Sequence, residues 1–284
     1  MSSAEDRIRN ISDTAIWAAM YRARENRRGD ALFRDPFAER LAGERGERIA
    51  EQMRAHGEHE WAWVMRTVLY DRVIAGRIAA GADMVVNLAA GLDARPYRMA
   101  LPPALQWVEV DLPDLVDYKE RILAGDEPAC RLERVRLDLA DVAARRQLFA
   151  SLGERSSNAL VITEGLLIYL TADEVGALAR DLAAARGFRH WVLEVVSPGL
   201  LRMLQREVGE ALEEARAPLK FGPPEGPAFF MKHGWKPVSV ESPLKAAARA
   251  KRLPFFLRLV AKLPESSGAQ GNRPWSGICL LEKI

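Results

Sequence analysis

Three acidic residues, Asp111, Asp138 and Glu164, each follow an apolar run that is typical of a β-strand. An earlier apolar run at 84–88 ends in the small residues 89–91. The carboxyl ends of parallel strands meet in one crevice, where small residues let the backbone approach a ligand and acids bind hydroxyl or cationic groups. The loop after residue 88 lacks the repeated glycines and the lysine that bind a pyrophosphate. These residues therefore indicate a hydroxyl-rich, cationic ligand, such as an adenosine that carries a sulfonium and an amino group.

The spacing of these runs supports the same interpretation. Asp111 forms an acidic pair with Glu109, and the pair follows the first run by about twenty residues, the separation at which an acid binds ribose hydroxyls in nucleotide sites. Each acid taken alone could equally be a helix cap or a solvated loop end. Three acids at three successive strand ends favour a ligand site.

Strand-like runs alternate with helical patterns along most of the chain, which favours a parallel sheet covered by helices on both faces. An apolar stripe predicts a helix from Glu60 to Ala80, and Thr171 with Glu174 forms a capping box that begins another. Pro36 predicts the start of a short helix that ends at Leu41. We therefore expect an α/β fold with a mostly parallel, seven-stranded sheet. The expected strands are 84–88, 106–110, 133–137, 159–163, 190–196, 235–240 and 276–282.

The order of these elements predicts one domain over 1–284, since the chain is long for one domain and short for two. Residues 12–80 are expected to form a helical N-terminal cap and 84–196 a cofactor-binding core. The proline- and glycine-rich region within 197–234 predicts a lid-like insertion. Residues 235–284 are expected to complete the sheet.

Composition limits the classes of protein that the chain can belong to. A formal net charge of +2 is too small to indicate nucleic-acid binding. The sequence contains no uninterrupted apolar run of about eighteen residues, so we expect neither a membrane span nor stable membrane association. Cys130 and Cys279 give no disulfide framework. Together with an N-terminus that does not resemble a signal peptide, this favours the cytoplasm.

Three stretches resemble successive motifs of the leucine carboxyl methyltransferase family. They are Asn87–Asp93, Glu109–Pro113 and Glu164–Thr171, and they occur in the family's order. The resemblance extends from about residue 13 to the end of the chain. It implies a Rossmann-like class I methyltransferase fold and S-adenosylmethionine as the cofactor. It also implies a methyltransferase that acts on a small-molecule acceptor.

The resemblance assigns roles to individual residues. Asp111 matches the acid that holds the ribose hydroxyls, and Asp138 with Leu139 matches the pair beside the adenine. Glu164 matches the acid near the amino group of the methionine portion. Arg66 resembles the helix arginine that pairs with the carboxylate of the cofactor.

The sequence departs from the family pattern at two points. Ala89 stands where the family loop has its first glycine, ahead of Gly91. A positive φ at Ala89 would cost roughly 1 kcal/mol, so we interpret it as a tolerated small side chain. The N-terminal helix also lacks the lysine of the phosphatase-directed members, for which Arg22 or Arg24 could substitute. This absence favours a small bacterial acceptor over a phosphatase tail.

The acceptor is predicted from the demands of the chemistry. A carboxylate has a pKa near 4 and needs no general base, whereas a phenol with a pKa near 10 does. The four histidines, His56, His59, His190 and His233, lie outside the motif loops. A carboxylate is therefore the expected acceptor, with a phenolic or polyketide hydroxyl as the alternative. Tyr169 and the insertion are candidates for shaping the acceptor pocket.

Other interpretations remain open at the level of sequence. A nicotinamide-dependent oxidoreductase would need a glycine-rich pyrophosphate loop, and a non-catalytic binding protein would need degraded ligand positions. His56 and His59 have helical spacing, but with no third ligand a metal site is not expected. The basic, apolar stretch 244–263 predicts a helix that covers the sheet, with a membrane-surface helix as the alternative. Trp17, Trp61 and Trp63 could line an aromatic pocket or pack in the core.

Overall fold

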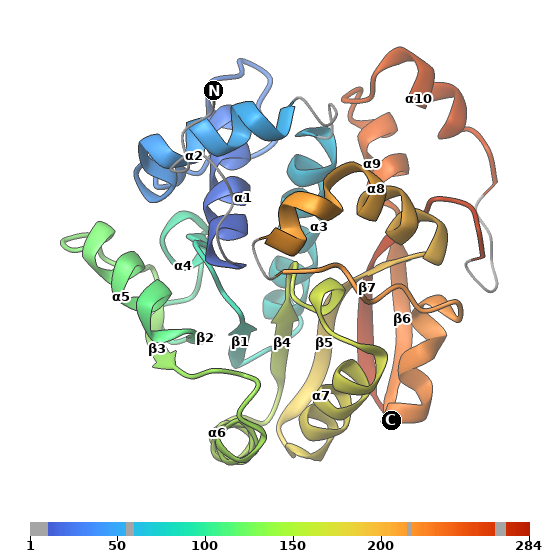
Figure 1. Cartoon of the computed structure of the whole chain (residues 1–284). Helices are drawn as coiled ribbons and strands as arrows, with labels where there is room; N and C mark the ends of the chain where they lie inside the picture. The colour runs from blue at the N-terminus through green and yellow to red at the C-terminus, as the bar shows by residue number, and fades with distance from the viewer. Residues whose placement is uncertain (1–10, 55–59, 215–216, 265–270) are drawn as a thin grey trace.

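Seven strands form one sheet in a computed structural model that describes residues 11–54, 60–214, 217–264 and 271–284. The strand order is β3-β2-β1-β4-β5-β7-β6 (Figure 1). Strands β1 to β5 are parallel, and β7 runs antiparallel to both of its neighbours. The strands are β1 (Met84–Leu88), β2 (Gln106–Asp111), β3 (Arg131–Arg136), β4 (Ala159–Thr163), β5 (Phe188–Val196), β6 (Trp235–Glu241) and β7 (Ser276–Lys283).

The two central strands explain why the sheet has this order. Every residue of β1 and of β4 is buried, because continuous apolar runs suit strands that are covered on both faces. Met84 pairs with Gln106 of β2 on one side and with Ala159 of β4 on the other. The chain therefore changes direction between β1 and β4, which opens a crevice at their carboxyl ends.

Helices cover both faces and one end of this sheet (Figure 1). The apolar side chains of α3 and α9 pack on one face, and those of α6, α7 and η3 pack on the other. Helices α1, α2 and α8 share a separate apolar cluster at the end where the parallel strands finish. Their bounds are α1 (Ile11–Asn26), α2 (Ala38–Arg54), α3 (Glu60–Ala79), α4 (Arg95–Arg98), α5 (Pro113–Ile122), α6 (Val142–Arg155), η2 (Leu167–Tyr169), α7 (Ala172–Ala184), α8 (Pro198–Glu214), η3 (Gly226–His233), α9 (Pro243–Arg249) and α10 (Phe255–Val260).

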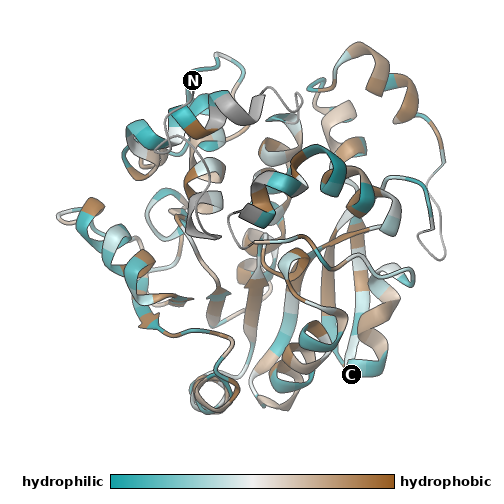
Figure 2. Ribbon diagram, in the orientation of Figure 1, coloured by the Kyte–Doolittle hydropathy of each residue, from teal (hydrophilic) through white to brown (hydrophobic). Residues whose placement is uncertain are grey.

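The expected α/β architecture is confirmed, and each expected strand overlaps an observed one. The brown, apolar central strands and the mixed colours of the covering helices are visible in Figure 2. The capping box at Thr171 is present, with Thr171 and Glu174 bonded reciprocally. The helix expected from Pro36 to Leu41 begins two residues later, at Ala38. Its end is close to the expected one, because the non-helical Gly43 (φ 58°, ψ −173°) divides α2 into two helices across a kink, the second of which continues to Arg54.

The insertion at 197–234 has two parts with different surroundings. Its first part, α8, packs against the N-terminal cap through apolar residues that include Leu201 and Leu212. Its second part, η3, contributes Phe229 and Phe230 to the main core, where Phe230 is fully buried. Leu219, which follows α8, belongs to the same cluster as the cap. A lid role for the insertion stays a prediction.

A buried ion pair joins α5 to the sheet. The Lys119 Nζ of α5 donates to Glu109 Oε1 over 2.8 Å, and the Arg134 Nε of β3 donates to the other carboxylate oxygen over 2.9 Å. Glu109 and Lys119 are both almost fully buried. Of the acidic pair, Glu109 is therefore engaged in this ion pair. Residues two apart in a strand point to the same face of the sheet, but the two acids have different partners, because Asp111 accepts the Gly91 N–H instead.

Replacing Glu109 with Ala should destabilise the protein by about 3–5 kcal/mol, because Lys119 would stay buried without its counter-charge. The free energy of unfolding in urea would measure this loss. Glu120→Ala is the control, since Glu120 bonds the exposed Arg136 and its removal should cost less than about 1 kcal/mol. Equal losses in the two variants would contradict a structural role for the Glu109 pair.

Candidate functional site

A cavity of about 510 Å³ lies at the carboxyl ends of the parallel strands, beside the N-terminal cap. All eight residues that the sequence proposes for the site line this cavity. Their individual contacts with a ligand stay predictions, but all of these residues border the same cavity. These residues are Arg66, Ala89, Gly91, Asp111, Asp138, Leu139, Glu164 and Tyr169.

The loop after β1 adopts the left-handed conformation twice. Ala89 and Gly91 both have a φ of 51°, so the interpretation of Ala89 as merely a small, unstrained side chain is wrong. A residue with a side chain pays roughly 1–2 kcal/mol in this region. The turn directs the Gly91 N–H toward the Asp111 Oδ2, which accepts it over 2.6 Å. Burial raises the pKa of Asp111, although hydrogen bonds from Gly91 and Leu112 partly offset the effect.

A buried network of charges follows this loop. The Arg95 guanidinium contacts Asp71 over 2.6 Å, and Asp93 and Glu164 over 2.8 Å each. Burial alone would raise the pKa of Asp93, but nearby cations, Arg95 foremost, lower it to about 2. The Asn87 amide donates to the same carboxylate over 2.9 Å. Asp93 therefore stays ionised and fixes the loop.

Sequence reasoning missed Asp93 and Arg95 as members of the site. Both belong to the motif that begins at Asn87, and both line the cavity. The available signal was an acid and an arginine two residues apart directly after a buried strand. Their partner Asp71 lies on α3, and nothing in the local sequence identifies it.

Arg66 of α3 lies between two acids from different strands. Its Nε contacts Glu164 over 3.1 Å and its Nη1 contacts Glu194 of β5 over 3.4 Å. The guanidinium also lies 4.3 Å from the centre of the Trp63 ring, a cation–π arrangement. A Cβ on Gly165 (φ 70°) would lie 3.4 Å from the Arg66 Nη1, so glycine suits this position sterically and conformationally.

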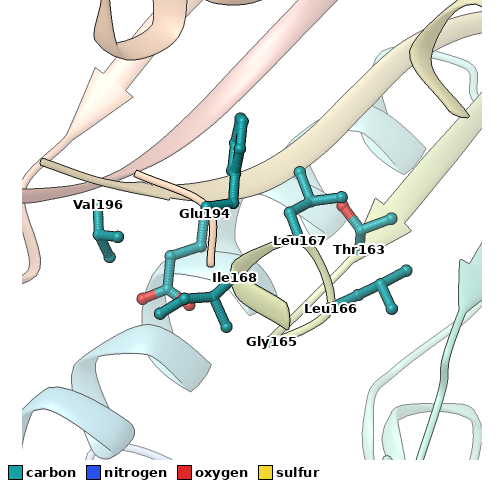
Figure 3. A pocket seen from close by; sticks show the side chains of 8 residues that line it. Thr163, Gly165, Leu166, Leu167, Ile168, Glu194 and Val196 are labelled. Carbon is teal, nitrogen blue, oxygen red and sulfur yellow. The ribbon is translucent and has the colours of Figure 1, made fainter. Parts of the chain in front are cut away.

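Glu194 is a fourth acid at a strand end, which the sequence analysis did not single out. Its signal was one acid in the otherwise apolar second half of β5. Burial raises the pKa of Glu194, with Glu164 adding to the rise and Arg66 opposing it. Glu194 also faces a small pocket of about 10 Å³, enough for one water. Figure 3 shows Glu194 beside Ile168, with Gly165 and Leu166, which also line the main cavity.

Arg145 holds the loop that carries Asp138 and Leu139. Its Nη1 donates to the Leu139 carbonyl over 3.0 Å, while its Nη2 bonds Asp181 of α7 over 2.6 Å. The Asp138 carboxylate accepts the Ala140 N–H over 2.9 Å. The loop is thus fixed from both ends, and Arg145 is a positioning residue that the sequence analysis overlooked.

Helix α1 forms one wall of the cavity. Arg22 lines the cavity, but its guanidinium bonds the Leu92 carbonyl over 2.6 Å and Asp35 over 2.9 Å. Arg24 instead bonds Glu47 of α2, so of these two arginines only Arg22 is placed to act near a ligand. The Thr14 side chain hydrogen-bonds Tyr169, and burial raises the pKa of that phenol. Tyr169 is therefore neutral at physiological pH.

Of the three tryptophans in the cap, one lines the cavity and the other two pack behind it or in the core. Trp63 lines the cavity, and Trp17 lies against it with a centroid separation of 4.8 Å. Trp61 packs at the edge of the cluster that includes α3. His56 and His59 lie outside the described residues. Among the residues that the structure describes, no group of acids, histidines or cysteines could hold a metal, and no helix could span a membrane.

Comparison with solved structures identifies the fold. A DUF574-family protein from Streptomyces avermitilis matches with a TM-score of 0.61 at 13% identity, covering 95% of this chain and 97% of its own. A provisionally named methyltransferase from Thermobifida fusca matches with a TM-score of 0.58 at 16% identity, covering 96% and 94%. At these identities the likeness establishes the fold alone.

Sequence relatives identify the chemistry. A protein from Parafrankia sp. is 30% identical over 92% of this chain and 88% of its own length. One from Mycobacterium tuberculosis H37Rv is 32% identical over 78% and 76%. Both are provisionally named S-adenosyl-L-methionine-dependent methyltransferases. The fold and these relatives define a class I methyltransferase that depends on S-adenosylmethionine. The chain belongs to the leucine carboxyl methyltransferase family, whose model matches residues 15–183.

Replacing Ala89 with Gly should stabilise the protein by about 0.5–1 kcal/mol, because glycine adopts the left-handed conformation without strain. The melting temperature and the free energy of unfolding would measure the gain. Ala90→Gly is the matched control: Ala90 has no positive φ, and its replacement should destabilise. A loss of stability in Ala89→Gly would show that the methyl group contributes more by packing than it costs in backbone strain.

Proposed function

We propose that this methyltransferase transfers its methyl group to oxygen, and that the acceptor is the carboxylate of a small molecule. The observation that carries the proposal is that all five acids lining the cavity are already engaged. None of them is a free base, and the described lining contains no histidine, lysine or cysteine. The acids are Asp93 and Glu164 in the arginine network, Asp111 and Asp138 bonded to backbone N–H groups, and Glu174 in its capping box.

The residues of the cavity fit S-adenosylmethionine. A volume of about 510 Å³ falls in the usual range for a ligand of this size. We propose that Asp111 holds the ribose hydroxyls and that Glu164 holds the amino group. Arg66 has five N–H donors and two acidic contacts, so donors remain for a carboxylate. Asp138 and Leu139 are proposed to flank the adenine.

Methyl transfer to a carboxylate requires the protein to orient the acceptor and to exclude water. S-adenosylmethionine, when bound, supplies an electrophilic methyl group on a sulfonium. A carboxylate is ionised at neutral pH and needs no proton removed. The walls contributed by α1, Leu166 and Tyr169 are proposed to exclude water and to orient the acceptor oxygen, which supplies much of the rate enhancement. The free cysteines are compatible with a proposed location in the cytoplasm.

A hydroxyl acceptor is the second candidate, and Glu194 is the observation that favours it. Glu194 lies half-buried at the edge of the site with a raised pKa, which moves a carboxylate toward the range in which a general base works best. Its contact with Arg66 at 3.4 Å favours the ionised form that a base requires.

Asp111→Ala should weaken the binding of S-adenosylhomocysteine at least tenfold, because a buried carboxylate that bonds hydroxyls is worth about 1.5–3 kcal/mol. Isothermal titration calorimetry measures the affinity directly. Asp114→Ala, an exposed acid three residues further along, is the control and should bind like the unmodified protein. An unchanged affinity in Asp111→Ala would remove Asp111 from the cofactor site.

The two acceptor classes give products of different stability. Para-hydroxybenzoate and its longer-chain homologues carry a carboxylate and a phenol in one molecule. The position of the transferred methyl group therefore shows which of the two the enzyme methylates. With S-adenosylmethionine labelled in the methyl group, a carboxyl ester should release labelled methanol in mild alkali. Label that resists alkali would identify a methyl ether and overturn the carboxylate proposal.

Glu194→Gln separates the candidates by pH dependence. With a carboxylate acceptor, the variant should keep kcat within a few-fold of the unmodified enzyme across pH 5–8, since no base is needed. With a hydroxyl acceptor, kcat of the unmodified enzyme should fall as the pH drops through the raised pKa of Glu194. The variant should then lose at least about a hundredfold in kcat and that pH dependence. Affinity for S-adenosylhomocysteine, measured in parallel, controls for disturbance of Arg66.

A further inference from the structure

Helix α10 carries an apolar face that no other element among the described residues covers. Phe255 and Phe256 are 78% and 66% exposed, and Leu259 is 60% exposed. Val260 and Leu263 continue the same face at helical spacing. None of the residues of α10 is buried. The expectation that stretch 244–263 covers the sheet is therefore correct for α9, which packs on α3. Helix α10 packs against the same cluster only through Leu257 and Ala261 and leaves its other face exposed.

The segment before α10 is anchored, so the helix is presented in a fixed place. Arg252 is largely buried and its Nη2 bonds Glu25 of α1 over 2.9 Å. Leu253 is buried in the cluster that contains α3 and α9. The chain then turns outward at Pro254, and α10 stands at the upper right in Figure 1, at the same end of the molecule as α1 and α8. Figure 2 shows apolar brown segments along it.

The charges around this face have one sign. Residues 243–264 contain six basic side chains and no acid. Lys251, Arg258 and Lys262 are exposed, and Arg258 donates to the Leu253 carbonyl, which leaves its positive charge without a carboxylate partner among the described residues. A short helix that combines exposed phenylalanines and leucines with flanking cations has the composition of a segment that lies in the interface of an anionic bilayer.

We propose that α10 is a docking surface for anionic phospholipid, through which the enzyme binds reversibly to a membrane surface. The apolar face, Phe255, Phe256, Leu259, Val260 and Leu263, enters the boundary between headgroups and acyl chains. Lys251, Arg258 and Lys262 contact the lipid phosphates. A second copy of the chain is the less suitable partner, because a two-fold interface would bring these cations against their own copies. The proposal concerns surface binding, and it is independent of the acceptor of the methyl group.

Co-sedimentation with vesicles tests the proposal on the full-length protein. Vesicles of phosphatidylcholine with phosphatidylglycerol should bind the protein at least tenfold more tightly than vesicles of phosphatidylcholine alone. Phe255→Ser combined with Phe256→Ser should reduce that binding at least tenfold. Arg258→Glu combined with Lys262→Glu should abolish the preference for phosphatidylglycerol.

Val238→Ser is the matched control, since Val238 is also an exposed apolar residue, on the edge strand β6. It should bind vesicles like the unmodified protein. Unchanged melting temperatures and S-adenosylhomocysteine affinity would show that the variants fold. Failure of the unmodified protein to bind phosphatidylglycerol vesicles would overturn the proposal. So would a dimer, detected by light scattering, that the double serine variant dissociates, because a second copy would then occupy the face.

Discussion

The Glu164 carboxylate lies between two arginines from separate elements, Arg66 of α3 and Arg95 of α4. Each ion loses hydration on burial, and only closely placed counter-charges offset that cost. The contact therefore fixes three things at once: the end of β4, the helix that packs on one face of the sheet, and the loop after β1. Asp71 and Asp93 extend the same network, so ion pairs join separate elements across the floor of the cavity.

This arrangement also sets the electrostatics of the site. Arginines balance the acids that would otherwise repel one another at the strand ends. A ligand with both an amino group and a carboxylate can exchange contacts with such a network without leaving a charge unpaired. The uncharged parts of the wall, from Ala15, Leu166 and Tyr169, lie beside this network. Charged side chains thus line one part of the cavity and uncharged side chains the other.

The sequence predicted the features that depend on local pattern. Buried parallel strands need continuous apolar runs, so β1 and β4 were located by composition alone. The acids at 111, 138 and 164 followed, because strand ends converge wherever parallel strands are adjacent. The resemblance to a family added the placement of Arg66, which no local pattern supplies.

The features that were missed depend on contacts between distant residues or on backbone conformation. Glu109 and Asp111 are two residues apart. Only the folded position of Lys119 shows that Glu109, and not Asp111, forms the buried ion pair. The positive φ of Ala89 follows from the path of the loop, since alanine by itself disfavours it. The exposed face of α10 shows the same limit, because a helix that leaves one apolar face exposed has the same sequence pattern as a fully covered one.

The contact between the N-terminal helix and the loop after β1 limits how this sequence can change over evolution. A Cβ built on Gly91 would lie 3.1 Å from the Ala15 Cβ, closer than side chains normally approach. The two positions, far apart along the chain, therefore share one small volume. Because both positions line the cavity, a larger residue at position 15 would crowd the loop after β1 and take up part of the cavity. Substitution at this position alone would therefore reshape the cavity and leave every charged residue of the floor unchanged.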